Sequence, residues 1–340
     1  MYHQNSFFLL NLGRREASYG AGVASGVDDW YKLMGPGLFK SDLQEDTDQD
    51  EINGARYPTA STLISARTSG DVSFKMNLEL LPFFLGLMCG NIATSGAEDP
   101  YTHVIDSPGI TAVAPWSTGV IQAHDRENVN SIKGYNGVVV TAMEFEISEA
   151  GAIEVKVTLK GDGTETDQSG VTPPTLTSAL AGTRLFKQHI SALTFGPSGG
   201  TTNLLSSQNL RKLSLKLEAD VEQKDSLASG LYAGEANYSG NGPVLTGELV
   251  VKGRRGDDFY NAVRARTVET LAMTIQQDAS NSFQVAGNSV RIPADAGVDC
   301  DFDESGPIIT VPLRFDYNTT DERAFRFTVL NGVSAYLASS

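Results

Sequence analysis

The sequence predicts a mainly β protein built from two copies of one module, each with one short flanking helix. The first observation is strict alternation, because five apolar residues from Val72 to Leu80 alternate with polar ones. This pattern is typical of a half-buried antiparallel strand. A less regular alternation recurs at 245–252, and a helix-like segment follows each run, at 81–90 and at 257–266. A repeated strand-helix-strands unit favours a pseudo-symmetric building block over an enzyme with a single cleft.

Residues 1–60 predict an extended N-terminal arm and an acidic loop that belong to the first module. The apolar stretch 6–12 is too short to span a bilayer and predicts an edge or arm strand. Between positions 42 and 51 the chain has six acids and no base. Such a run is typical of a solvated loop, here long enough to project.

Calcium binding is the alternative reading of this loop, because Asp46, Asp48 and Asp50 alternate. An EF-hand needs glycine at the position of Glu51 and a bidentate glutamate at the position of Tyr57. The EF-hand reading is therefore rejected.

Residues 61–165 are expected to form the first compact module. Strands are predicted at 101–105 and 138–140. The clearest hairpin pairs 143–147 with 153–159, with one face uniformly apolar. The opposite face is charged and carries Glu144, Glu146, Glu154, Lys156 and Lys160.

The boundary between the modules is predicted within 160–174, because this segment is rich in Gly, Thr, Asp and Pro. Residues 166–205 are therefore expected to be a linker or insertion. Residues 206–340 form the second module, which opens with alternation at 213–221. Further strands are predicted at 245–252, 271–275, 309–317 and 325–330.

The composition is that of a folded protein whose acidity disfavours binding to a phosphate backbone. The 340 residues include 26 Lys and Arg against 41 Asp and Glu, a net charge of −15. Binding to a phosphate backbone by counterion release needs clustered cations, so this mode is excluded. The two cysteines, Cys89 and Cys300, lie far apart, and Cys89 is expected to be a buried small hydrophobe. A disulfide scaffold is not expected, which fits synthesis in a reducing cytosol.

Motifs for catalysis or cofactor binding do not emerge. No two of the four histidines are three to five residues apart, and His103 is expected to be structural. The glycines at 20–26 and 196–200 have the spacing of neither a dinucleotide fingerprint nor a nucleophile elbow. The Arg255-Gly-Asp257 tripeptide is read as a strand-to-helix connection with Asp257 as the N-cap. We expect no enzyme, no cofactor and no metal.

Several segments, in this order, resemble one known family. They are Gly13–Gly20, Ser69–Phe74 running into 80–86, Tyr101–Val104 and the hairpin 141–163. The chain resembles the tail tube proteins of long-tailed, siphovirus-like bacteriophages in their two-module form, over about residues 10–335. The order and spacing of the segments carry the likeness. The acidic loop is unusually long for the family, and 176–202 has no match.

The resemblance implies β-sandwich or barrel modules that assemble into stacked rings around a channel. Six modules complete a ring in this family, so three chains would form a pseudo-hexameric homotrimer, with a hexamer of chains as the alternative. The implied partners are further copies of the chain, a tape measure protein and tail-end proteins. DNA would pass through without specific binding. The chain would be made in the host bacterial cytoplasm and reside in the virion, with no membrane contact.

Two groups of residues are candidates for assembly or for lining the channel. Glu144, Glu146, Glu154 and Lys156 are candidates for facing the lumen or a ring contact, and an outer solvent face is the other reading. The ring-stacking candidates are the acids of the long loop, Asp42, Glu45, Asp46, Asp48, Asp50 and Glu51.

Two other classes of function stay open at this point. A glycan- or receptor-binding β-sandwich of a virion or cell surface would need an aromatic-lined groove and would remain a monomer. A hydrolase with a carboxylate site would show turnover that a single carboxylate substitution abolishes.

Overall fold

The computed structural model describes residues 7–10, 14–22, 29–32, 39–47, 61–109, 114–123, 132–148, 152–168, 171, 183–196, 202–203, 210–225, 230–240, 242–253, 265, 268–293, 299–303 and 306–339. The fold is mainly β, as predicted, and 19 strands belong to one hydrogen-bonded network. Beside them lie α1 (Leu80–Cys89) and the short 3-10 helix η3 (Lys187–His189).

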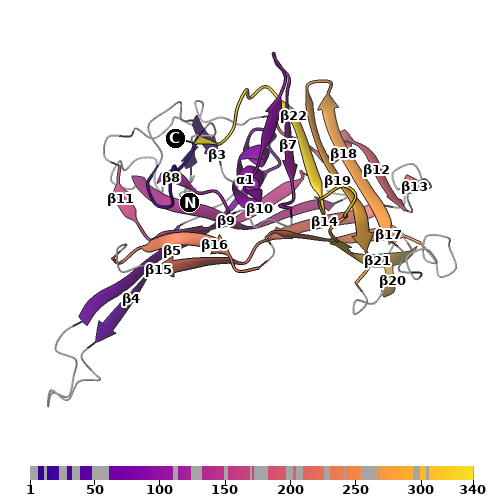
Figure 1. The fold of residues 1–340 in the computed structure, drawn as a ribbon. Coiled ribbons are helices and arrows are strands. Elements are labelled where there is room, and N and C mark those ends of the chain that lie inside the picture. Colours follow the sequence, from indigo (N-terminus) through magenta and orange to yellow (C-terminus); the bar gives the residue numbers. More distant parts are fainter. Residues whose placement is uncertain are drawn as a thin grey trace, which may run out of the picture.

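The largest feature is an arching antiparallel sheet that runs the length of the molecule (Figure 1). We call it the long sheet. Its neighbouring strands all pair antiparallel. In spatial order they are β4 (Lys40–Thr47), β5 (Ser61–Lys75), β10 (Glu154–Gly161), β9 (Ile132–Ser148), β14 (Leu210–Glu218), β17 (Val244–Lys252), β21 (Gly306–Phe315) and β20 (Asp299–Asp303).

The strand order of the long sheet repeats once. The hairpin β4–β5 is followed in space by β10 and then β9, and the hairpin β14–β17 is followed by β21 and then β20. Each unit therefore consists of a hairpin and two later strands. Of these two strands, the one that comes later in the chain lies next to the hairpin. The pairing of β9 with β14 joins the two units.

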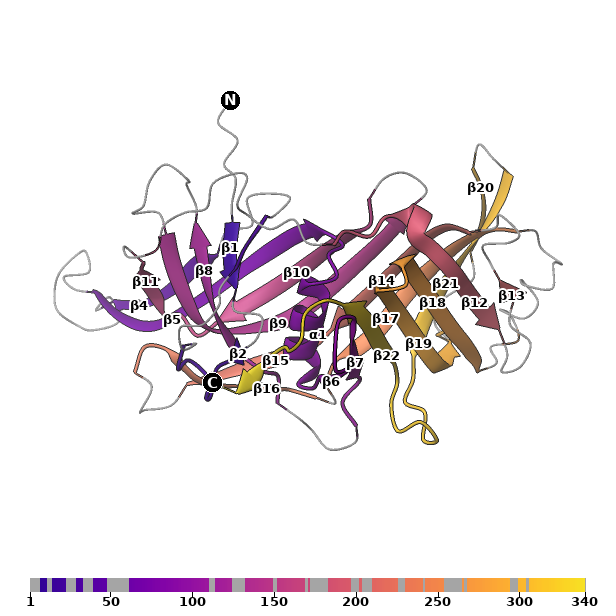
Figure 2. The ribbon, with the colours of Figure 1, turned by 90° about the horizontal axis from the view of Figure 1, so that it is seen from above.

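A second layer of strands lies on one face of the long sheet, over its second unit (Figure 2). In it, β22 pairs with β7, so strands from the first and second halves of the chain are neighbours. The layer consists of β13 (Thr202–Asn203), β12 (Ile190–Gly196), β18 (Glu269–Asp278), β19 (Asn281–Arg291), β22 (Arg326–Asn331), β7 (Tyr101–Asp106) and β6 (Ala93–Ser95).

The first half of β9 belongs to a third group of strands. This group corrects the prediction that the segment 6–12 is an edge or arm strand. This group orders β3 (Asp29–Lys32), β1 (Phe7–Leu10), β8 (Thr118–Ala123), β9 and β11 (Glu165–Asp167). The segment 6–12 does contain a strand, but β1 pairs on both sides and is not an edge. Leu9 and Leu10 are both buried, and a continuous apolar run without alternation is the pattern of such an interior strand.

Two short pairs complete the described strands. The hairpin β15 (Val221–Asp225) and β16 (Ala233–Tyr238) extends from β14 and β17. It packs beside β5, where the Ala66 amide donates to the Leu231 carbonyl, and beside the end of β10, where the Gln223 side chain donates to the Gly161 carbonyl. The parallel pair β2 (Arg14–Arg15) and β23 (Ala338–Ser339) joins the two ends of the chain.

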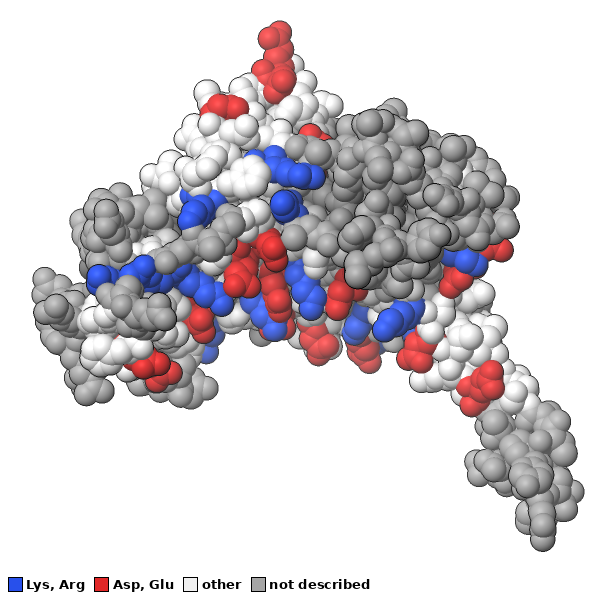
Figure 3. Space-filling model, turned by 180° about the vertical axis from the view of Figure 1, so that it is seen from behind, with Lys and Arg blue, Asp and Glu red and all other residues white. Residues whose placement is uncertain are grey.

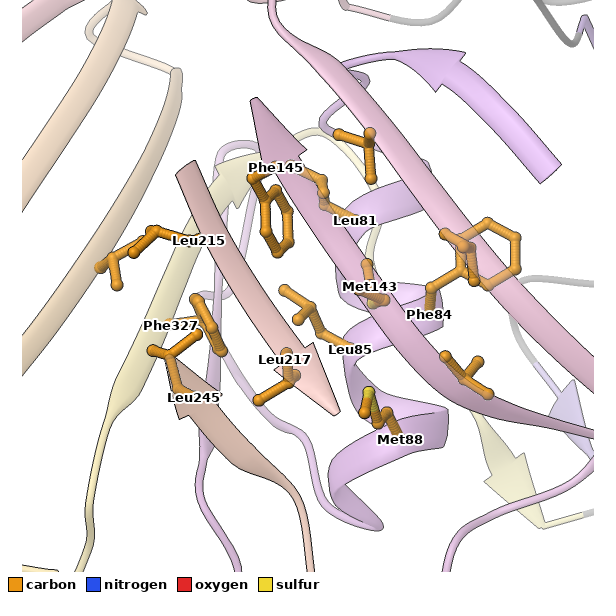
Figure 4. Packing of buried hydrophobic residues seen from close by; sticks show 14 of the residues in the cluster. Leu81, Phe84, Leu85, Met88, Met143, Phe145, Leu215, Leu217, Leu245 and Phe327 are labelled. Atoms are coloured by element: carbon orange, nitrogen blue, oxygen red, sulfur yellow. The ribbon is translucent and has the colours of Figure 1, made fainter. Parts of the chain in front are cut away.

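The helix α1 lies almost where the sequence predicts it and is buried along its whole length. The Asn77 side chain accepts the Glu79 amide at 2.8 Å, and the Asn77 carbonyl accepts the Leu81 amide, which starts the helix. Gly90 ends it with a positive φ of 66°, a conformation that glycine adopts without strain. Leu81, Leu85 and Met88 point toward β9 and β14 (Figure 4).

One hydrophobic core runs through both halves of the chain. Phe145 of β9 stacks against Phe283 of β19 with ring centroids 6.0 Å apart and lies 6.3 Å from Phe327 of β22. The expected first and second modules thus share one core and one sheet.

The other strand predictions have mixed outcomes. The strands expected at 101–105, 271–275, 309–317 and 325–330 are confirmed as β7, β18, β21 and β22. The run 213–221 is confirmed as β14 up to Glu218, and Val221 begins β15. The segment 166–205, expected as a linker or insertion, contains β12, which pairs with β18. The domain boundaries stay predictions. The helix expected at 257–266 lies outside the described residues, apart from Ala265.

Candidate assembly surface

The two faces of the long sheet differ in chemistry because side chains alternate along each strand. On β9, Met143, Phe145 and Ile147 are buried, while Glu144 and Glu146 between them are exposed. The same alternation holds on β5, β10, β14, β17 and β21. The buried side chains face α1 and the second layer. We call the opposite, exposed surface the polar face.

Charged side chains on the polar face form rows that cross the strands in register. Opposite residues of neighbouring antiparallel strands have their Cβ atoms about 4.5–5.5 Å apart, so members of a row are neighbours. The first row contains Ser73, Lys156, Glu144, Lys216, Thr246 and Arg314. The second row contains Lys75, Glu154, Glu146, Ser214, Glu248 and Pro312.

Ion pairs link these rows across the junction between the two units. Lys216 Nζ lies 3.6 Å from Glu144 Oε1 and 2.7 Å from Glu218 Oε1. Lys212 Nζ lies 3.5 Å from Glu146 Oε1. The hydrogen bond to Glu218 is the main reason that the pKa of Lys216 lies above its ordinary value.

Positive and negative groups are nearly balanced on the polar face, in contrast to the net charge of −15 for the whole chain. Figure 3 shows Lys and Arg alternating with Asp and Glu along the hollowed lower surface of the molecule. Where the six inner strands, from β5 to β21, pair with one another, the carboxylates are Asp71, Glu144, Glu146, Glu154, Glu218 and Glu248, and the cations are Lys75, Lys156, Lys160, Lys212, Lys216, Lys252 and Arg314.

The structure brings the four residues predicted from the first hairpin together on this face. Glu154 is opposite Glu146, and Lys156 is opposite Glu144. Lys156 also forms an ion pair of 3.7 Å with Asp71 of β5.

The acidic loop is described only in part. Asp42 and Glu45 are exposed on β4, and Asp46 also belongs to this strand. The β4–β5 hairpin projects from the body of the molecule (Figure 1). Asp48, Asp50 and Glu51 lie outside the described residues.

Sequence reasoning missed the cations of the second unit that meet the predicted acids. Lys216 belongs to the run 213–221, whose alternation did predict a strand, and Lys212 directly precedes that run. Alternation shows which residues share a face but not which strand is the neighbour. Opposite charges on two polar faces were the available signal, since cross-strand ion pairs stabilise a sheet.

A buried carboxylate holds the N-terminal arm against β9. Glu16 accepts the amides of Gly20, Gly22 and Gly137 at 3.2, 3.0 and 2.9 Å. Asp162 is buried nearby and accepts the Thr164 amide at 2.7 Å. Burial, and to a lesser degree the charge of Glu16, raises the pKa of Asp162. This arrangement explains why the segment 14–22 is part of the fold.

Of the other residues considered for a reactive role, His103 and Cys89 are buried within the fold. His103 is buried between the Thr94 hydroxyl at 2.9 Å and the Asn331 side chain at 3.0 Å, and burial lowers its pKa. Cys89 is buried in α1, as predicted, and Cys300 is exposed. Arg255 and Asp257 lie outside the described residues. Where the structure describes the chain, no three metal-binding side chains cluster.

Among the described residues no helix has the length and apolar character needed to cross a membrane. Comparison with curated proteins found no match. A family model described as phage tail tube protein matches residues 10–316. This range contains every strand of the long sheet and nearly all of the fold described above. The chain therefore belongs to the phage tail tube protein family, a family of structural virion proteins.

Proposed function

We propose that the chain polymerises as stacked rings into the hollow phage tail tube that conducts DNA to the host. The single observation that carries the proposal is the polar face of the long sheet. It is hollowed, exposed and nearly charge-balanced, whereas the other face holds the core (Figure 3). An inner channel wall needs these properties, because it must stay hydrated while the opposite face supports the fold. The role is structural and involves no catalytic step.

Three chains would form each ring. The strand order of the long sheet repeats once within the chain, so one chain would supply two of six equivalent positions. A ring of six chains is the alternative. The repeat supports the two-module reading, since a pseudo-sixfold wall from three chains requires two similar units in each.

The wall would let DNA pass by offering it no continuous cationic track. Double-stranded DNA carries about one negative charge per 1.7 Å of its axis and binds where cations are clustered. Lys212 and Lys216 are paired with Glu146 and Glu144, so their charges are partly neutralised locally. Glu144, Glu146, Glu154 and Lys156 are the proposed lumen-facing residues of the first unit.

The projecting β4–β5 hairpin would contact the next ring in the stack. Asp42 and Glu45 on β4 are exposed and belong to this projection. Tape measure and tail-end proteins would contact the inside and the ends of the tube. The chain would be made in the host cytoplasm and be incorporated into the virion.

Negative-stain electron microscopy of the purified protein, with end-on views classified by symmetry, tests the proposal. We expect hollow rings or tubes with three chains per ring. A monomer that stays dispersed at high concentration and with tail nucleating factors present would contradict it. That outcome would favour a glycan- or receptor-binding β-sandwich instead.

A further inference from the structure

The segment 14–22, which we call the strap, links the C-terminal strand to the hairpin β15–β16. Its first two residues form β2, whose only described strand partner is β23. The Arg15 guanidinium lies over the Trp116 ring, 4.0 Å from the ring centroid. Further along the strap, the Tyr19 hydroxyl accepts a hydrogen bond from the Gln223 side chain of β15. The strap therefore connects parts of the chain that are far apart in sequence.

The strap folds around a buried carboxylate of its own, that of Glu16. This side chain accepts the amides of Gly20 and Gly22 within the strap. It also accepts the amide of Gly137 on β9, and the Glu16 amide donates to the Ser117 carbonyl at 3.0 Å. Hydrogen bonds to an ionised acceptor are about twice as strong as those between neutral groups. The charge on Glu16 therefore helps to close the strap onto β9.

A second buried carboxylate, that of Asp162, lies against the strap. Asp162 is 3% exposed and accepts both the amide and the hydroxyl of Thr164. A Cβ atom added at Gly20 would lie only 2.7 Å from Asp162 Oδ2, so the missing side chain of Gly20 makes room for the carboxylate. Gly20 also has a φ of 77°, which glycine adopts without strain. The closed strap thus covers Asp162 and keeps water from it.

The other elements packed against Asp162 do little to compensate two negative charges. Where the structure describes the chain, neither Glu16 nor Asp162 forms an ion pair. Arg67 of β5 acts on Asp162 only weakly, because its guanidinium is bound to Asp225 of β15. From the strap, Tyr19 faces the site as a neutral hydroxyl, since burial raises its pKa. At this site β9 contributes the uncharged Asn136 and Gly137.

Burial next to a like charge determines how protons affect the strap. Burial, and to a lesser degree the charge of Glu16, raises the pKa of Asp162. Opening the strap would hydrate Asp162 and move Glu16 away from it, which returns this pKa toward its ordinary value. The closed strap therefore binds the Asp162 proton more tightly than the open strap does. Closure is favoured at low pH, and this advantage is lost as pH rises through the raised pKa.

We propose that the strap is a pH-sensitive switch that stays closed while Asp162 keeps its proton and opens more readily once Glu16 and Asp162 are both ionised. Opening breaks the bond from Gly137 to Glu16 and separates Tyr19 from Gln223. It also releases β23, because β2 is the only described partner of that strand. All of these contacts lie within one chain, so the switch does not depend on the proposed tube.

Hydrogen exchange of the purified full chain, followed by mass spectrometry at several pH values, tests the switch. After correction for the intrinsic pH dependence of exchange, we expect the opening equilibrium of peptides covering 14–22 to rise from acid to neutral pH. The rise should be at most about tenfold per pH unit, because one proton is linked to opening. Peptides covering β23 should follow the same profile, whereas peptides covering 142–148 of β9 should not.

Two variants and a matched control separate the charge from the fit of the strap. Asp162→Asn carries no charge at any pH, so the opening of its strap should not change with pH. Asp299→Asn removes an exposed carboxylate and should keep the wild-type profile. Gly20→Ala should open the strap at every pH, because the added Cβ would collide with Asp162 and the positive φ would be strained.

Each outcome bears on the switch and leaves the proposed function to its own test. Wild-type strap opening that stays constant from acid to neutral pH would overturn the switch, whether or not any variant folds. An unchanged pH profile in a folded Asp162→Asn protein would overturn it as well. The same pH dependence in peptides covering 142–148 would indicate global unfolding and contradict a local switch. A Gly20→Ala strap that is as protected as the wild type would contradict its contact with Asp162.

Discussion

The two faces of the long sheet share one backbone but differ in what their side chains determine. Phe145 is 1% exposed and contacts aromatic rings from two other strands, whereas the side chain of Glu146, the next residue, is 60% exposed. The buried face determines the fold, and the polar face is the surface for which we propose a role in the channel. Substitutions on the first should therefore change stability, and substitutions on the second should change function at nearly constant stability.

The largest effect is expected from Phe145→Ala. Removing this ring leaves a cavity against Phe283 and Phe327, and large-to-small aromatic substitutions in a core cost about 3–5 kcal/mol. Denaturant unfolding of the unassembled chain measures the loss. Phe302→Ala is the matched control, because an exposed ring should change the free energy of unfolding by less than about 0.5 kcal/mol. Equal losses of unfolding free energy in the two variants would contradict the view that only the buried face determines the fold.

Reversing the acids of the polar face should alter DNA delivery more than it alters the fold. In the variant E144K/E146K/E154K, cations would outnumber carboxylates along the first two rows and attract the phosphate backbone. We expect tubes to form but DNA to pass more slowly in an ejection assay. Unchanged delivery by this variant would remove these three residues from the proposed lumen.

A third expectation contrasts buried with exposed carboxylates. The pKa of Asp162 is raised by burial, so the folded state holds its proton more tightly than the unfolded state. Stability from this group is full below the ordinary aspartate pKa and is lost as pH rises through the raised value. Between acid and neutral pH, the wild type should therefore lose stability relative to Asp162→Asn. Thermal melts across that range measure it, with the exposed Asp299→Asn as control. Parallel pH curves for wild type and Asp162→Asn would refute the assignment.

The smallest effect is expected from Lys216→Gln. The side chains of Lys216, Glu144 and Glu218 are 44–52% exposed, and exposed ion pairs contribute about 0.2–1 kcal/mol. The loss should shrink further in high salt, which screens such pairs. Chemical unfolding at two salt concentrations tests this. A loss as large as that of Phe145→Ala would show that the polar face is also needed for the fold.

Sequence patterns predicted which segments form strands and helices better than they predicted which strands pair with each other. The alternation around Phe145 and the apolar run of α1 are local signals, and the structure confirms both. The pairing of β9 with β14, or of β7 with β22, joins segments far apart in the chain. Local periodicity carries no information on such pairing. The position of β1 between two strands was mistaken for the same reason.

For the candidate surface, too, the sequence predicted which residues share a face but not which residues of distant strands lie beside them. Glu144, Glu146, Glu154 and Lys156 were placed on one polar face because period-two alternation is reliable in a hairpin. The lysines of β14 that pair with these acids depend on long-range register.

Cryo-electron microscopy of assembled tubes tests most directly whether the polar face of the long sheet lines the channel. We predict a ring of three chains in which Glu146, Lys212 and Lys216 point toward the axis and the strands form a closed wall. A reconstruction in which these side chains lie on the outer surface would contradict the account.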